Sequence, residues 1–494
     1  MSCFVALTAR AVQAAASPSS RRFLRALEDP RQTQSRLLRL LVHDAARTAY
    51  GRTHGLLPKD GLAEFQRKIP IVSYQDLRPW IERSLAGEPS VLSPHPLRRV
   101  EHTAGSGGTL KTIPYNRPIL RSFSRMFTLW AHDLLRRRYR PVTGRLFLCV
   151  TAGRPEGPRA NKRWVADDRD YLSPLWNVLL HRFVAAPDFD ATSETEDPLD
   201  RLAHALAQEP QLELLSFWSP SLLLAALDHL SVENSSDTAR LWPRLQIISC
   251  WTAGSSARFI ERLTRLFPNA AIQGKGLIAT EAPITFPMED AGGCVPLVTE
   301  VFLEFLSGEG EIVLLDQLDS RREYELLLST RGGLLRYRLG DRVAVAGRFR
   351  GCPLLEFTGR AGIVSDLVGE KISAAFVERE LAPALTGYFC LLPGNGRYEL
   401  WLEDGSSAIA AQVEAILFRN PHYARARLLG QLQPLRVRTA QRLAEKVAAA
   451  LSSSPDPSSG PRPGDIKPPL LLHRIEWAER LRHADGHRPP VHKE

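Results

Sequence analysis

The residues best suited to chemistry lie between His102 and Tyr115, in the run His-Thr-Ala-Gly-Ser-Gly-Gly-Thr-Leu-Lys-Thr-Ile-Pro-Tyr. Five small or hydroxylic residues, 105–109, precede Lys111. Glycines let the backbone approach a ligand closely, and successive free amide N–H groups form a concavity that suits phosphate oxygens. Lysine adds a compact positive charge at its edge. Because the order differs from the Walker pattern, the run is either another kind of phosphate loop or a solvated turn.

The segments on either side of this loop predict the elements that hold it. An apolar-to-basic approach at 96–100 predicts a strand that enters the loop. After the loop, apolar residues at helical spacing predict a helix from about 117 to 138. A helix directly after the loop would point the positive end of its dipole toward bound phosphate. Upstream, apolar positions within 23–50 predict helices that Pro30 divides.

Farther along the chain, strands and helices alternate. Apolar runs at 144–150, 212–218 and 245–251 predict buried strands, and the last two are followed by small-residue turns and helices. This alternation indicates an α/β architecture with substantial parallel pairing. The segment 152–170, rich in Gly, Pro and Arg, predicts an exposed loop, whereas closely spaced strands between 298 and 357 predict a distorted antiparallel barrel or sheet.

The pattern divides the chain into unequal parts. We expect an N-terminal segment at 1–22 with a possible targeting role, a large domain at 23–362, and a smaller α+β domain at 363–494. Within the last part, the Ser- and Pro-rich stretch 452–463 is expected to be flexible. The His- and Arg-rich stretch 473–494 is expected to be a mobile basic tail.

The composition narrows the function classes. The 494 residues suffice for two or three domains, and a hydrophobic content of 44% is ordinary for a globular protein. No run reaches the roughly eighteen uninterrupted apolar residues of a membrane-spanning helix. The net charge of +10 comes mostly from scattered arginines without interleaved aromatics. We therefore expect no nucleic-acid partner, and the charge suits anionic small molecules; protein partners are left open.

The cysteines and the N-terminus bear on the compartment. None of the six cysteines forms a Cys-x-x-Cys pair, and Cys149 and Cys250 lie in apolar runs, which predicts buried, reduced thiols of an intracellular protein. The segment before Glu28 contains arginine, serine and alanine but no acid. It fits either a mitochondrial transit peptide or the start of an amphipathic helix. We expect a cytoplasmic protein, with mitochondrial or endoplasmic reticulum association left open.

Several short segments, taken in order, resemble the auxin-responsive Gretchen Hagen family of acyl acid–amido synthetases, within the adenylate-forming superfamily. The loop at 102–111 is similar to the family's Ser/Thr-Ser-Gly-Thr-rich phosphate loop ending in lysine. Ala279-Thr280-Glu281 resembles its Ser/Thr-Glu segment, and Tyr337-Arg338-Leu339-Gly340-Asp341 matches its Tyr-Arg-x-Gly-Asp segment without change. The likeness continues through Glu356-Phe-Thr-Gly-Arg360 to Lys467-Pro-Pro, and so covers most of the chain.

The resemblance implies a two-step ligase that uses ATP and Mg²⁺. A carboxylic acid attacks the α-phosphate of ATP to give an acyl-adenylate and pyrophosphate, and an amine or amino acid then displaces AMP to form an amide. Such chemistry relies mainly on positioning and charge stabilisation. The implied fold is a large N-terminal α/β plus β-barrel domain of adenylate-forming type with a smaller C-terminal α+β domain. That domain would swing about a hinge near 360–369 to assemble the site.

The resemblance also implies roles for particular residues. Lys111, Glu281 and Lys467 would be catalytic, and Glu281 would bind Mg²⁺, which prefers one or two carboxylates plus waters. Asp341 would accept hydrogen bonds from the ribose hydroxyls, and Arg360 would face the ribose or phosphate. The hydroxyls and the lysine of the loop would hold the β- and γ-phosphates. The full set expected to bind the nucleotide is Ser106, Gly107, Gly108, Thr109, Lys111, Thr280, Tyr337, Arg338, Asp341 and Arg360.

Each of these residues also has an ordinary structural interpretation. Glu281 is equally consistent with an exposed loop acid. Asp341 follows Gly340 and is consistent with a hairpin turn. Tyr337 and Arg338 are consistent with an exposed strand pair, and Arg360 with a cap or salt bridge at a hinge.

Three departures from the family pattern bear on activity. The family loop has Gly-Thr where this chain has Ala104-Gly105, and a hydroxyl's hydrogen bond to a charged phosphate contributes about 1.5–3 kcal/mol. Leu277 stands where the family has an aromatic residue that stacks on adenine, and Lys467-Pro-Pro lacks the arginine that the family usually places next. We predict an acid–amino acid ligase, with a catalytically degenerate nucleotide- or acyl-ligand-binding protein as the alternative.

Overall fold

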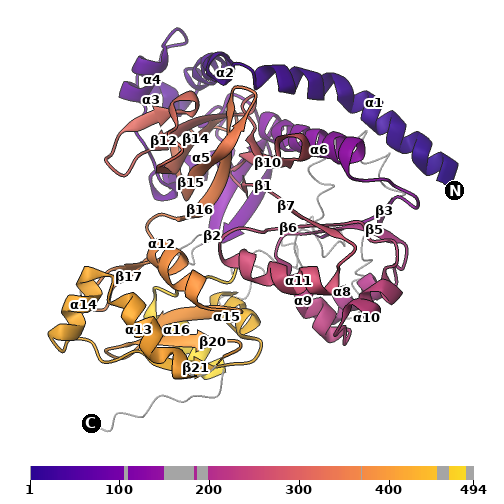
Figure 1. Cartoon of the computed structure of the whole chain (residues 1–494). Coiled ribbons are helices and arrows are strands. Elements are labelled where there is room, and N and C mark those ends of the chain that lie inside the picture. Colours follow the sequence, from indigo (N-terminus) through magenta and orange to yellow (C-terminus); the bar gives the residue numbers. More distant parts are fainter. Residues whose placement is uncertain are drawn as a thin grey trace.

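The structure, a computed structural model, has three regions (Figure 1): an antiparallel sheet covered by the N-terminal helices, a parallel sheet with its own helices, and a smaller C-terminal unit. The predictions for 105–109, for 152–170 and for almost all of 452–463 lie outside the described residues. The structure describes residues 2–104, 110–149, 183–185, 198–368, 370–405, 407–452 and 467–484.

Two long helices open the chain. α1 (Ser2–Ala26) packs against α6 and runs without a break across the boundary expected at residue 22. α2 (Pro30–Ala45) begins where the Asp29 carboxylate accepts a hydrogen bond from the Gln32 N–H at 2.8 Å, and its first residue is proline, which needs no hydrogen-bond donor there. Pro30 therefore divides the helices as predicted. Three shorter helices follow: α3 (Ala49–Thr53), α4 (Leu62–Lys68) and α5 (Tyr74–Leu85).

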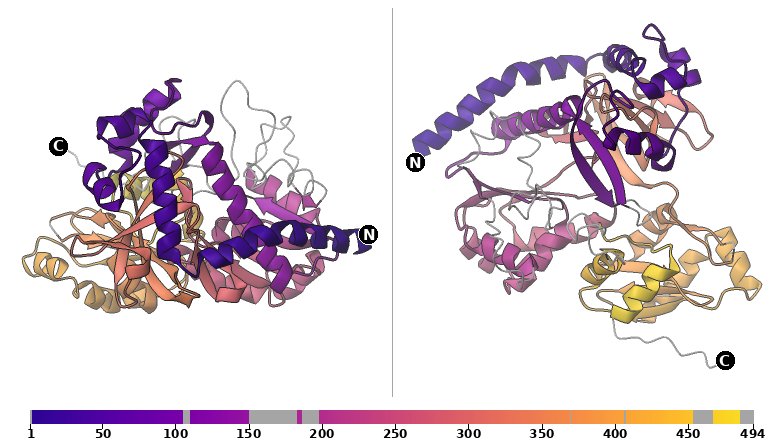
Figure 2. Two further views of the ribbon diagram at one scale, coloured as in Figure 1. Left: turned by 90° about the horizontal axis from the view of Figure 1, so that it is seen from above. Right: turned by 180° about the vertical axis from the view of Figure 1, so that it is seen from behind.

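An antiparallel hairpin flanks the loop at 105–109. β1 (Leu97–Ala104) pairs with β2 (Leu110–Asn116), and α6 (Arg117–Arg137) starts where the Asn116 side chain accepts a hydrogen bond from Ile119 N–H at 3.1 Å. The predicted strand and helix are both present. The expectation that the helix directly follows the loop is wrong, because 110–116 first returns along β1 as a strand. The hairpin extends toward the C-terminal unit (Figures 1 and 2).

A five-stranded parallel sheet has the order β4-β3-β5-β6-β7, which confirms the parallel pairing predicted from the three apolar runs. Parallel strands align their carboxyl ends at one edge of a sheet, where ligands of α/β proteins commonly bind. The strands are β3 (Arg145–Cys149), β4 (Val184–Ala185), β5 (Leu212–Phe217), β6 (Ile247–Cys250) and β7 (Ala271–Gly274). The accompanying helices are α8 (Pro198–Ala207), α9 (Pro220–His229), α10 (Ser235–Leu241), the 3₁₀ turn η2 (Gly254–Phe259) and α11 (Ile260–Leu266).

The region from 298 to 360 is antiparallel, as predicted. Its sheet has the order β13-β12-β14-β15-β16, and two hairpins, β8–β9 and β10–β11, lead into it. The sheet strands are β12 (Val301–Leu306), β13 (Ile312–Leu314), β14 (Glu323–Thr330), β15 (Tyr337–Phe349) and β16 (Cys352–Arg360). The hairpin strands are β8 (Ile278–Ala279), β9 (Ala282–Pro283), β10 (Thr285–Met288) and β11 (Gly293–Pro296).

The C-terminal unit is a small α+β arrangement. Its three-stranded sheet has the order β19-β20-β21. Within the expected basic tail, α16 (Ile475–Ala484) is a helix that buries Trp477, Ala478 and Leu481, so the tail prediction is wrong for these residues. The other elements are β17 (Val364–Ser365), β18 (Ile372–Ser373), α12 (Ala374–Phe376), the π-helical turn η5 (Val377–Leu381), β19 (Phe389–Pro393), β20 (Tyr398–Leu402), α13 (Ala410–Leu417), α14 (Pro421–Leu428), β21 (Arg436–Thr439) and α15 (Leu443–Ser452).

Two large apolar clusters hold these regions together. One combines the N-terminal helices with the antiparallel sheet, for example Phe65 with Phe302. The other joins the parallel sheet to the C-terminal unit. Between those two regions, Phe259 stacks on Tyr388, and the Arg258 guanidinium donates to the carbonyls of Ala382 and Leu385. The C-terminal unit is therefore packed against the carboxyl edge of the parallel sheet.

Candidate functional site

A lysine, a tyrosine and a glutamate meet near the loop end of the β1–β2 hairpin. The Tyr337 hydroxyl donates to Oε1 of Glu281 at 3.0 Å, and Lys111 Nζ lies 3.2 Å from the Tyr337 hydroxyl and 3.6 Å from Oε1 of Glu281. The Glu281 side chain is only 5% exposed. Burial, and next the charge of Glu281, raises the pKa of Tyr337, so the tyrosine is a neutral donor at physiological pH. The prediction of an exposed loop acid at Glu281 is therefore wrong.

Local structure explains why these three side chains converge. Glu281 stands in the two-residue turn between β8 and β9, while Tyr337 begins β15 and Lys111 lies on β2. The Tyr115 hydroxyl donates to the Thr280 carbonyl at 2.5 Å, which fixes the turn to β2. The Tyr74 hydroxyl accepts from the Thr112 N–H at 2.9 Å, which ties the hairpin to α5.

Asp341 and Arg360 form a second pair. They are directly opposite each other on β15 and β16, and Arg360 Nε donates to Oδ1 of Asp341 at 2.7 Å. Asp341 is buried within β15, whereas the Arg360 side chain is 42% exposed. The hairpin-turn interpretation of Asp341 is therefore wrong. The nearby Asp341 charge raises the pKa of Arg360, so the guanidinium remains charged.

Lys467 approaches this pair from the C-terminal unit. Its Nζ lies 4.1 Å from the ring centre of Trp251 and 5.6 Å from that of Phe357. Burial lowers the pKa of Lys467 to about 8, while the charge of Asp341 opposes this effect. Cation–π contacts of this kind position an ammonium group without occupying its hydrogen-bond donors. The structure therefore brings Lys467 to the seam between the C-terminal unit and β16.

Arg338 does not join either cluster. Its guanidinium makes a bidentate pair with Glu325 at 2.6 and 2.7 Å, and its side chain is 51% exposed. Of the two residues interpreted as an exposed strand pair, Arg338 is exposed and Tyr337 is fully buried. The fold places the predicted nucleotide-binding residue Arg338 on the opposite side of its strand from Tyr337.

Ser106, Gly107, Gly108 and Thr109 lie outside the described residues, so their predicted phosphate contacts stay predictions. Sequence reasoning missed Trp251, Phe357 and Glu378, which surround Lys467. Trp251 had a usable signal, because it is the last residue of the predicted strand 245–251, and ligands of α/β proteins bind at the carboxyl ends of parallel strands.

The chemistry of Glu281 fits a magnesium ion that also contacts phosphates. Among the described residues, Oε1 of Glu281 accepts a hydrogen bond from Tyr337 and forms an ion pair with Lys111, while Oε2 makes no hydrogen bond. Mg²⁺ usually takes one or two carboxylates and completes its shell with waters and phosphate oxygens. Within the described part of the chain no three His, Cys, Asp or Glu side chains gather as a metal cage.

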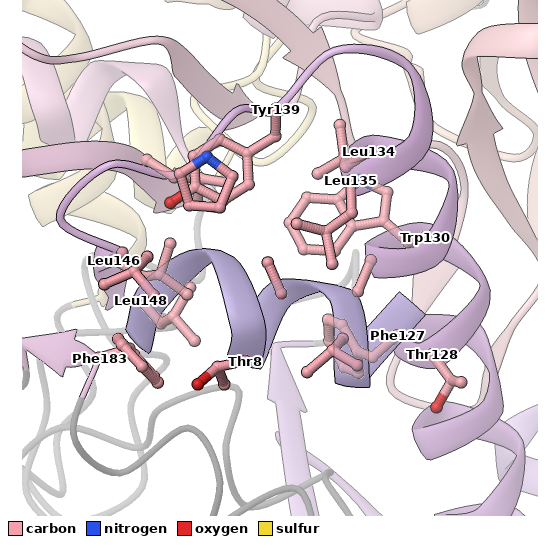
Figure 3. Close-up of a pocket in the computed structure, with 17 residues that line it drawn as sticks. Thr8, Phe127, Thr128, Trp130, Leu134, Leu135, Tyr139, Leu146, Leu148 and Phe183 are labelled. Atoms are coloured by element: carbon pink, nitrogen blue, oxygen red, sulfur yellow. The ribbon is translucent and has the colours of Figure 1, made fainter. Parts of the chain in front are cut away.

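A separate apolar cavity of about 130 Å³ lies between α1, α6 and the parallel sheet (Figure 3). Its lining includes Val12, Trp130, Leu146 and Leu214, and none of its 17 lining residues is charged. It offers no charged group to hold a phosphate or a metal. The charged clusters at the hairpin and the seam are therefore the better candidate site.

The free thiols agree with the prediction of reduced cysteines that was made from the sequence. Cys250, Cys294, Cys352 and Cys390, whose side chains are described, form no disulfide. Among the described helices, none is long and apolar enough to span a membrane.

Comparison with solved structures identifies the fold. A GH3.15 acyl acid amido synthetase in complex with 2,4-DB superposes with a TM-score of 0.76 at 17% identity, over 94% of this chain and 95% of that one. A 2-hydroxyisobutyryl-CoA ligase in its postadenylation state gives a TM-score of 0.54 at 16% identity, over 92% and 90% of the two chains. The chain has the fold of adenylate-forming enzymes, as predicted.

Family models and relatives give a finer identification. The GH3 family N-terminal domain matches residues 19–236, and the GH3 family central domain matches residues 294–360. The chain belongs to the GH3, or Gretchen Hagen, family. A probable indole-3-acetic acid-amido synthetase from Oryza sativa is 22% identical over 77% of this chain and 76% of the relative. A GH3 domain-containing protein from Homo sapiens is 28% identical over 48% of this chain and 50% of the relative.

Proposed function

We propose that this protein is an ATP-dependent acid–amino acid ligase, which adenylates a carboxylic acid and transfers its acyl group to an amine. The observation that carries the proposal is a pair of buried carboxylates, Glu281 and Asp341, that each keep one oxygen without a hydrogen bond among the described residues. A cation, Lys111 or Arg360, approaches the other oxygen of each. A carboxylate oxygen without a hydrogen bond can accept from a ligand hydroxyl or bind Mg²⁺, so two such oxygens beside two cations favour a ligand that supplies donors or a metal.

The first step in this proposal uses charge from both sides of the seam. Lys111 stabilises the phosphates, and Arg360 faces the ribose or phosphate next to Asp341. Lys467 stabilises the charge that develops as the carboxylate oxygen bonds to the α-phosphorus and the bond to pyrophosphate breaks. Mg²⁺, held by Glu281, would neutralise charge on the phosphate oxygens.

The second step forms the amide. The amine nitrogen bonds to the acyl carbon, the bond to AMP breaks with its electron pair on the phosphate oxygen, and the amine releases its surplus proton. The rice relative and the GH3.15 neighbour are both named amido synthetases, which supports an amide product. The proposal includes the two-step scheme of the family and the hinge before the C-terminal unit.

Leu277 affects how tightly the nucleotide binds. Its side chain is buried in the same apolar cluster as Ile284 and Phe286, so it presents no aromatic face. An aromatic side chain stacking on a base contributes about 1–3 kcal/mol in nucleic-acid complexes. We therefore expect ATP to bind more weakly than it would with an aromatic residue at this position.

Calorimetry with Mg²⁺ and ATP tests the nucleotide site on the wild type and on Asp341→Ala. We expect saturable binding that weakens at least about tenfold in the variant, because a hydrogen bond to a charged group contributes about 1.5–3 kcal/mol. Asp341→Asn keeps the side-chain shape in case Asp341→Ala fails to fold. Asp319→Asn is the matched control, since Asp319 is also paired with an arginine but lies on the surface.

ATP–pyrophosphate exchange with a panel of carboxylic acids then tests the chemistry. Acid-dependent exchange supports the ligase. Saturable ATP binding with no exchange for any acid contradicts it and favours the catalytically degenerate binding protein. No binding to folded wild-type protein at millimolar ATP overturns the nucleotide site itself.

A further inference from the structure

A glutamate of the C-terminal unit lies beside Lys467 at the seam. Glu378 belongs to the π-helical turn Val377–Leu381, and π-helical turns occur frequently at functional sites. A methyl group built on Gly359 would lie 2.7 Å from Oε2 of Glu378, so the carboxylate rests directly against the backbone of β16. Phe357, whose ring Lys467 contacts, is two residues away on the same strand.

Glycine is required at this contact for two reasons. The backbone of Gly359 has φ +146, a conformation that side-chain-bearing residues rarely adopt. A side chain there would also displace the Glu378 carboxylate. Gly359 therefore admits a carboxylate next to Arg360, the residue that follows it.

Neither Glu378 nor Lys467 has a hydrogen bond or an ion pair with another described residue, although both are half-buried. Thr358, which lies between Phe357 and Gly359, also has a buried hydroxyl without a hydrogen bond. Polar groups that are withdrawn from water without partners are rare unless a ligand or water completes them. The seam thus combines a carboxyl group and an amino group that form no hydrogen bond with another described residue, and one buried hydroxyl without a partner.

We propose that Glu378 is a positioning residue, which keeps the Lys467 ammonium charged and directed at the Asp341–Arg360 pair. The inference deepens the function proposed above and rests on it for its catalytic meaning. Lys467 must be charged to stabilise the first step, yet its burial favours the neutral amine. The Glu378 carboxylate, which rests against the stretch of β16 that Lys467 contacts, offsets that effect.

The charged groups around the two residues act in both directions. Lys467 experiences Asp341 and Glu378, which raise its pKa, and Arg360, which lowers it. Burial raises the pKa of Glu378 to about 7; Lys467 and Arg360 oppose the rise, while Asp341 and Glu323 add to it. At pH 7 the Glu378 carboxyl is about half ionised, so replacing it with a neutral residue removes part of a negative charge, and the pKa of Lys467 should fall.

The decisive measurement is the pH dependence of Lys467 acetylation in competitive labelling with acetic anhydride, followed by mass spectrometry. It needs no enzymatic activity. In Glu378→Gln we expect about three- to fivefold faster labelling of Lys467 at pH 7, for a fall of roughly half to one pH unit in its pKa. Glu380→Gln is the matched control, because Glu380 lies on the same turn but pairs with Arg379 and Arg419 at the surface.

A labelling profile of Lys467 that is identical in wild type and Glu378→Gln overturns the inference. The pH profile of pyrophosphate exchange tests the catalytic role. A rate that falls on the alkaline side at lower pH in Glu378→Gln than in the wild type, with Glu378→Asp close to wild type, supports that role. A shift in labelling without any exchange in the wild type supports the electrostatic coupling and overturns the ligase instead. Should Glu378→Gln fold poorly, Glu378→Ala is labelled in its place, and a Lys467 profile identical to that of the wild type overturns the proposal.

Discussion

Two charged clusters at opposite ends of the segment 336–360 differ in how completely they are paired. Arg336 donates from Nε to both oxygens of Glu304 and from Nη1 to the carbonyls of Gln66 and Ile69. The Gln66 side chain completes the network by donating to Glu304 at 2.9 Å. At the seam, Lys467 and Glu378 have no such partners among the described residues.

The difference distinguishes charges that stabilise the fold from charges that are available to a ligand. A buried ion pair with all its hydrogen bonds satisfied holds the α4 region against β12, and any ligand would have to break it. A charge left without partners has desolvation energy that a ligand can recover. By this criterion Lys467 fits the proposed nucleotide site and Arg336 does not, even though Arg336 stands directly before the Tyr-Arg-x-Gly-Asp segment.

The largest expected effect is on stability, at the fully paired cluster. Glu304→Ala leaves the Arg336 charge buried without its partner, which should lower the free energy of unfolding by about 3–5 kcal/mol. Urea denaturation measures it. Glu309→Ala removes a surface partner of Arg322 and should cost less than about 1 kcal/mol. Equal effects from the two variants would contradict the comparison.

The next effect is on catalysis, at the hairpin. Lys111→Ala removes the cation at the phosphate loop and should reduce pyrophosphate exchange about 10²- to 10³-fold, the usual cost of losing one preorganised charge stabiliser. Because Lys111 is partly exposed, the free energy of unfolding should change by only about 1 kcal/mol. Lys59→Ala, at an exposed lysine, is the control. Full activity of Lys111→Ala would remove this residue from the site.

The smallest effect is expected at Arg338. The sequence predicted it to bind the nucleotide, but its guanidinium is paired with Glu325 and half-exposed. Arg338→Ala should leave the ATP affinity within about twofold and lower the stability by about 1 kcal/mol or less. Calorimetry and urea denaturation check the two values. A tenfold loss of ATP affinity would mean that the salt bridge opens for the ligand.

The sequence predicted most of the strands because their pattern is local. The apolar runs at 212–218 and 245–251 are the buried strands β5 and β6, and the start of α2 follows from Pro30 alone. The prediction of a helix directly after the phosphate loop was wrong because 110–116 pairs with a preceding strand. The helix at 475–484 was missed because its apolar residues are few within a basic stretch, and burial against the C-terminal sheet stabilises it.

By itself the sequence determined the family, the order of its motifs and the identity of Lys111, Glu281, Asp341, Arg360 and Lys467 as candidates. Only the tertiary structure decided which of them act together. Glu281 and Tyr337 are 56 residues apart yet share a hydrogen bond, and Glu378 and Lys467 meet at β16 through long-range packing. The partners and the burial of a side chain depend on how the whole chain packs. The spacing of residues in the sequence therefore predicts neither the salt bridge of Arg338 nor the lack of hydrogen bonds at Lys467.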